Sequence, residues 1–122
     1  MEKGIAHDLE RAAVDAVLKS GVLSRAPGLA QMLIYICEQY FRGEINTIKE
    51  YTIAVEALGR PADFDQRKDA IVRVEAYRLR KRLAKFYSGQ GADCPVQIHI
   101  PPGQYVPQFI PRRVVALAAC ES

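Results

Sequence analysis

The chain has 122 residues, of which 49% are hydrophobic and 25% are charged, and its formal net charge is +3. This length suits one folded domain, and the composition is that of a globular protein with a packed core, which excludes intrinsic disorder. No apolar run approaches the ~20 residues that a membrane span needs, and the amino terminus lacks the apolar centre of a secretory signal. We therefore expect a cytoplasmic protein with no membrane partner.

The residues that usually carry chemistry are few and scattered. Cys37, Cys94 and Cys120 form no CxxC pair or Cys/His cluster, which favours free thiols over a disulfide framework or a zinc site. His7 and His99 have no neighbouring partner for catalysis or metal binding, so we expect both on the surface. The sequence contains no nucleophile elbow, no phosphate-binding glycine loop and no paired catalytic carboxylates. We expect no enzyme activity, no metal and no cofactor.

Helical periodicity marks three segments in the first half of the chain. The first runs from about Ile5 to Lys19, and the second from Pro27 to Phe41 has the widest apolar face, so it should be the most buried. A third helix is predicted from Thr47 to about Leu58. Thr47 and Glu50 have the spacing of a capping box, in which the hydroxyl accepts from a first-turn amide and the carboxylate reaches back.

The fourth helix is the longest that the pattern predicts. Asp69 is placed to cap it, it extends to about Tyr87, and the loop before it, residues 60–67, should tuck Phe64 into the core. Spacings of four, three, four and three residues define a core stripe: Val72, Ala76, Leu79, Leu83 and Phe86. The opposite side carries Arg73, Val74, Tyr77 and Lys81, flanked by Arg78, Arg80 and Lys85. The exposed face of this helix is therefore predicted to be basic.

The positive charge is concentrated in this part of the chain. Residues 67–85 hold eight Lys/Arg against two acids, whereas the other 103 residues hold nine basic and 12 acidic side chains. The segment therefore carries +6 on a body of −3. Such an asymmetry favours a polyanionic partner.

After the fourth helix the period changes to two. Residues 96–100 alternate as a strand, Pro101-Pro102-Gly103-Gln104 supplies a turn, and Tyr105 to Phe109 continues as a second strand interrupted by Pro107. The pattern predicts a β-hairpin. Residues 111–122 are expected to be a carboxy-terminal tail or an extra strand.

These elements follow the order of a winged helix-turn-helix with an extra amino-terminal helix, a mainly α fold with a small β-hairpin. The sequence IVRVEAYRLRKRL at 71–83, followed by a hairpin with Gly103 and Tyr105, resembles the recognition helix and wing of the OmpR-type domain of bacterial transcription regulators. KEYTIAVE at 49–56, Gly59-Arg60, Asp63-Phe64-Asp65 and residues 101–107 are similar to a winged-helix domain at the amino terminus of bacterial signalling proteins. The resemblance covers roughly residues 9–109 and implies a winged-helix domain over residues 1–110.

The resemblance implies double-stranded DNA as the partner and a role in transcription regulation. Helix 70–87 would read the major groove, and the helix before it would brace it, with Lys49 near the DNA backbone. By motif position the base-reading surface carries over to Arg73, Val74, Tyr77 and Arg78. Arg80 and Lys81 would lie near phosphates, and the hairpin would touch an adjacent segment of DNA.

Some alternatives stay open at the level of sequence. Tyr77 could contact a phosphate or a thymine methyl, or pack against the preceding loop. Glu75 is expected to pair with Arg78 or Arg82 along the helix. The alternative function is a protein-interaction module whose basic face binds an acidic protein partner, such as a regulator or an RNA polymerase subunit. A homodimer on a two-part site is expected because one helix reads only a few base pairs, and the first helix could supply the contact.

Overall fold

The computed structural model describes the backbone of residues 2–111 and the side chains of residues 7–111, so Pro111 alone of the predicted tail lies within it. The three long helices are α1 (Glu2–Lys19), α2 (Pro27–Phe41) and α4 (Ile71–Tyr87), with 18, 15 and 17 residues. Short helical turns connect α2 to α4: η1 (Ile45–Thr47), α3 (Glu50–Thr52) and η2 (Ile53–Ala57). Strands β1 (Val96–His99) and β2 (Gln108–Pro111) pair antiparallel. The predicted mainly helical architecture with a small hairpin is confirmed.

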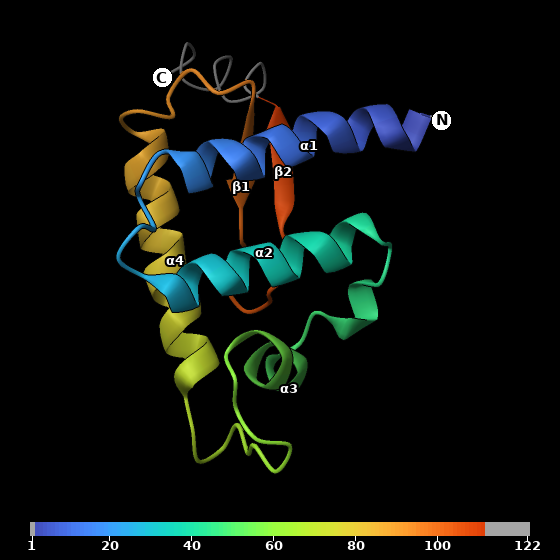
Figure 1. Cartoon of the computed structure of the whole chain (residues 1–122), viewed down its shortest axis with the longest axis vertical. Coiled ribbons are helices and arrows are strands. Elements are labelled where there is room, and N and C mark those ends of the chain that lie inside the picture. Colours follow the sequence, from blue (N-terminus) through green and yellow to red (C-terminus); the bar gives the residue numbers. More distant parts are fainter. Residues whose placement is uncertain (1, 112–122) are drawn as a thin grey trace.

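Helix α2 lies at the centre of the packing. It runs beside α1, contacts α4 and η2 on its other sides, and α1 and α4 both pack against β1 (Figure 1). Six of its side chains belong to the core: Leu29, Met32, Leu33, Ile36, Cys37 and Phe41. The Cys37 thiol is free, and burial raises its pKa. In this arrangement α2 and the hairpin cover one side of α4.

The core stripe of α4 is buried along its whole length, as predicted. Leu79, at its middle, is 0% exposed. At the start of the helix the Ile71 amide donates to Asp69 Oδ1 over 3.1 Å, but the N-cap residue is Ala70 and no side chain makes the N-cap hydrogen bond, so Asp69 lies one residue before the cap position predicted for it. The burial of this stripe determines which way every other side chain of α4 faces.

The third helical segment differs from its prediction. The predicted capping box of Thr47 and Glu50 is wrong, because η1 is a separate turn that ends at Thr47. The Thr47 hydroxyl instead donates to the Glu44 carbonyl over 2.7 Å, and its oxygen lies 3.1 Å from Gln39 Oε1. The helix begins at Glu50, with the Lys49 amide donating to Thr52 Oγ1 over 3.3 Å, and it continues as the π-helical turn η2.

The second strand also begins later than predicted. Strand β2 starts at Gln108 and pairs with β1 from His99↔Gln108 to Val96↔Pro111. Pro107 is fully buried just before the strand, and like Pro101 and Pro102 it has no amide hydrogen to donate to a ladder. The result is a long turn of residues 100–107 in place of a tight one.

Replacing Leu79 by Ala should test how much the fold depends on the core stripe. We expect a loss of about 2–5 kcal/mol in the free energy of unfolding, because a fully buried Leu→Ala change removes apolar contacts and leaves a cavity. Urea denaturation followed by circular dichroism measures it. Leu9→Ala is the matched control: Leu9 is 55% exposed, so its effect should stay within about 0.5 kcal/mol. Equal losses for the two variants would contradict the assignment of the core.

Candidate functional site

The side of α4 opposite the core stripe is open to solvent. Arg73, Arg78 and Lys81 are exposed there, and between them Val74 is 46% exposed and Tyr77 is 58% exposed. We call these five residues the outer face of α4. The predicted exposed basic face is confirmed for them, and the structure brings them together on one rigid helix.

Two acidic side chains brace the arginines of the outer face. Glu75 Oε1 accepts from Arg78 Nη1 over 3.3 Å, which confirms the predicted pairing along the helix. Arg73 Nε lies 3.8 Å from Glu50 Oε2, and its Nη2 donates to the Gln66 carbonyl over 3.0 Å. Ion pairs of exposed arginines contribute little to stability, so their main effect here is to direct the two guanidinium groups.

Glu50 is the residue of this site that the sequence reasoning placed wrongly. Its side chain is 12% exposed and joins three elements: α3, α4 through Arg73, and the chain before β2 through Tyr105. Tyr105 Oη donates to Glu50 Oε1 over 3.5 Å. Burial, followed by the charge of Glu50, raises the pKa of Tyr105. These partners are distant in the sequence, and the spacing from Thr47 pointed to a local cap instead.

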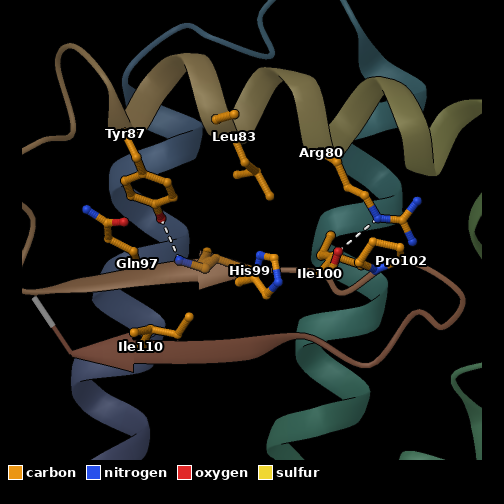
Figure 2. Close-up of a pocket in the computed structure, with 10 residues that line it drawn as sticks. Arg80, Leu83, Tyr87, Gln97, His99, Ile100, Pro102 and Ile110 are labelled. Atoms are coloured by element: carbon orange, nitrogen blue, oxygen red, sulfur yellow. Dashed lines mark hydrogen bonds between the residues drawn. The ribbon is translucent and has the colours of Figure 1, made fainter. Parts of the chain in front are cut away.

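Arg80, unlike the arginines of the outer face, donates hydrogen bonds to the hairpin turn. Its Nε donates to the Ile100 carbonyl over 2.8 Å (Figure 2). Its Nη2 donates to the carbonyls of Pro101 and Gln104 over 3.2 and 3.0 Å. The planar guanidinium group suits such a set of converging acceptors. Arg80 therefore does not belong to the outer face. Its hydrogen bonds hold the hairpin turn beside the middle of α4.

A second contact holds the hairpin further along α4. Tyr87 Oη accepts from the Ile98 amide over 2.9 Å, and burial raises the pKa of Tyr87 to about 12 (Figure 2). Between Tyr87 and Arg80 lies a mostly apolar groove of about 310 Å³, lined by Leu83 of α4 and by residues of both strands. The hairpin also contacts α2 through Phe109, whose ring centroid lies 5.6 Å from that of Phe41.

Further cations lie near the start of α4 and of α3. Lys49 is exposed at the residue before α3. Arg67 and Lys68 are exposed in the loop before α4, where Asp65 Oδ1 accepts from the Arg67 amide over 2.9 Å and from its Nε over 3.2 Å. These hydrogen bonds from Arg67 hold the pKa of Asp65 below its usual range. The Asp65 side chain thus holds the turn between residues 65 and 67.

The surroundings of Tyr77 bear on one of its three predicted roles, packing against the loop before α4. Tyr51 is the aromatic residue that packs near Phe64 of the preceding loop, with ring centroids 6.4 Å apart. Tyr77 contacts Lys81 instead: the Lys81 ammonium lies 5.3 Å from the centroid of its ring. The tyrosine is thus held by a cation on its own helix, and the rest of its ring faces solvent.

Within the described part of the chain, His, Cys, Asp and Glu form no group of three that could hold a metal ion. No helix of residues 2–111 combines the length and apolar character needed to cross a membrane. Comparisons with protein-family models, with curated proteins and with solved structures found no match to this chain.

Arg80→Lys should test the anchoring of the hairpin turn. Lysine keeps the positive charge but cannot present a planar fork to three carbonyls, so we expect a loss of about 1–3 kcal/mol in the free energy of unfolding. Faster amide hydrogen exchange at His99 and nearby strand residues should accompany it. Arg78→Lys, at an exposed arginine, is the control and should change stability by less than about 0.5 kcal/mol. A stability and exchange pattern for Arg80→Lys like that of the control would contradict the anchor.

Proposed function

We propose that this protein is a sequence-specific, double-stranded-DNA-binding transcription regulator with a winged helix-turn-helix fold, in which α4 enters the major groove. The observation that carries the proposal is the outer face of α4. Its arginines and lysine are donors that reach phosphates and base edges, and they extend from one helix whose opposite side is locked in the core. A helix of this kind fits the width of the major groove of B-DNA.

The distribution of partners among the basic residues strengthens the proposal. Two of the arginines of residues 67–85 serve the fold: Arg80 holds the hairpin turn, and Arg82 Nη1 donates to the Val22 carbonyl over 2.8 Å. The remaining cations of this segment are exposed on α4 and the loop before it: Arg67, Lys68, Arg73, Arg78, Lys81 and Lys85. A cluster of this kind creates the positive field that attracts a nucleic-acid backbone.

The elements beside α4 fit supporting roles in the same complex. Arg60 Nε lies 2.9 Å from Asp69 Oδ2. This ion pair connects the chain just after η2 to the residues just before α4. Lys49 is the exposed residue just before α3. It is a candidate phosphate contact, as the resemblance to winged-helix domains implies. The hairpin is the wing of the proposed fold, and we assign Arg80 to holding that wing in place of the phosphate contact expected from its sequence position.

Selection of bound fragments from a genomic DNA library, at several salt concentrations, tests the proposal. The wild-type chain should enrich one motif. Arg73→Ala should relax preference at one base position and cost about 1–3 kcal/mol there, because it removes a base-edge donor. Lys81→Ala should weaken binding uniformly and reduce the salt dependence by about one phosphate contact.

Arg42→Ala is the matched control for this experiment. Arg42 is exposed at the end of α2 that lies away from α4 (Figure 1), so its loss should change neither the motif nor the salt dependence appreciably. Failure of every variant and of the wild type to enrich a motif, with weak binding insensitive to Arg73 and Lys81, would exclude the major-groove model. The basic face would then be assigned to an acidic protein partner.

The expected homodimer provides a separate prediction. Two copies on a two-part site double the number of base pairs read, and this gain is the physical reason to expect them. Light scattering of the protein with a duplex that contains the enriched motif should give two chains for each duplex. A single chain on DNA, together with a monomer in its absence, would contradict dimerisation and leave DNA binding untouched.

A further inference from the structure

Two large apolar side chains lie in the middle of the basic outer face. Val74 and Tyr77 are 46% and 58% exposed and lie three residues apart, so they are neighbours on the helix surface. Arg73, Arg78 and Lys81 surround them on the same face. They are the large exposed hydrophobic residues of α4.

Neither packing nor helix propensity explains this pair. Valine is less favourable than lysine, glutamate or alanine at an exposed helix position, because its branched side chain loses rotamer freedom. Isolated exposed apolar residues are common on proteins. Here, however, two of them are adjacent and enclosed by cations, so a partner that fits the face must combine negative charge at its edges with an apolar group between them.

The major groove of DNA has this combination. Phosphates line both sides, and among the base edges only thymine presents an apolar group, its C5-methyl. We propose that α4 recognises thymine through Val74 and Tyr77, so that the target contains at least one thymine whose methyl packs between these side chains. This inference rests on the proposed function and adds a base identity to it.

The contact between Lys81 and Tyr77 supports the assignment. The Lys81 ammonium lies 5.3 Å from the centroid of the Tyr77 ring, so one part of the ring is directed by a residue that can also reach a phosphate. Lys81 then couples the position of the ring to the DNA backbone. Val74, with its single stiff χ1 rotamer in a helix, presents its methyl groups in a defined direction beside the ring.

The test replaces thymine by deoxyuridine, one position at a time, in a duplex that carries the enriched motif. Deoxyuridine keeps every hydrogen-bonding group of thymine and lacks only the methyl. Binding of the full-length chain is measured at one salt concentration. At one or two positions the wild type should bind the deoxyuridine duplex about fourfold more weakly, the effect expected from one buried methyl group.

Three variants assign this effect to Val74 and Tyr77. Val74→Ala and Tyr77→Ala should bind the thymine duplex more weakly and lose sensitivity to deoxyuridine at the affected positions. Tyr77→Phe should keep the sensitivity, because the ring and not the hydroxyl packs on the methyl. Ile34→Ala is the matched control, since Ile34 is 42% exposed on α2 outside this face and its loss should leave the sensitivity unchanged. Circular dichroism establishes that each variant is folded.

The outcomes separate this inference from the proposed function. An enriched motif with no sensitivity to deoxyuridine at any position would overturn thymine recognition and leave DNA binding in place. Sensitivity that persists in both alanine variants would overturn the assignment to Val74 and Tyr77. The absence of any enriched motif would overturn the proposed function and the inference with it.

Discussion

Burial of the core stripe of α4 is the constraint on which the rest of this structure depends. Val72, Leu79 and the other members of the stripe are held between α2 and the hairpin, so rotation of the helix would expose them to water. At about 25 cal/mol for each Å² of apolar surface, that exposure would consume a large part of the stability of a small domain. The direction of the outer face is therefore a consequence of the core, and the cations on it are presented by a rigid element.

The same helix also positions the hairpin. Arg80 and Tyr87 lie between the core stripe and the outer face, and both bond to backbone groups of the hairpin. The turn, which contains prolines without amide hydrogens, is thus held by a side chain of α4 where its own ladder cannot hold it. Core, candidate interface and hairpin consequently share one helix, and any motion of the hairpin relative to the outer face must break contacts to Arg80.

Much of the candidate site could be predicted from the sequence because it is local to one helix. Periodicity alone placed Arg73, Val74, Tyr77, Arg78 and Lys81 on one exposed side, and the pairing of Glu75 with Arg78 followed from its spacing. Arg80 and Glu50 could not be placed in this way. Their partners, Ile100 and Tyr105, lie far along the chain. The resemblance instead implied a phosphate contact for Arg80, and the spacing from Thr47 suggested a helix cap for Glu50.

The sequence by itself determined the three long helices, the hairpin and the basic side of α4, because apolar spacing and glycine and proline positions act over a few residues. Only the tertiary structure decided where β2 begins, how η1, α3 and η2 divide the third helical segment, and which arginines donate to backbone carbonyls of other elements. Those features depend on backbone groups and side chains that meet after folding. Arg80 and Arg82 have the same local pattern as the exposed arginines, and only the position of distant carbonyls distinguishes them.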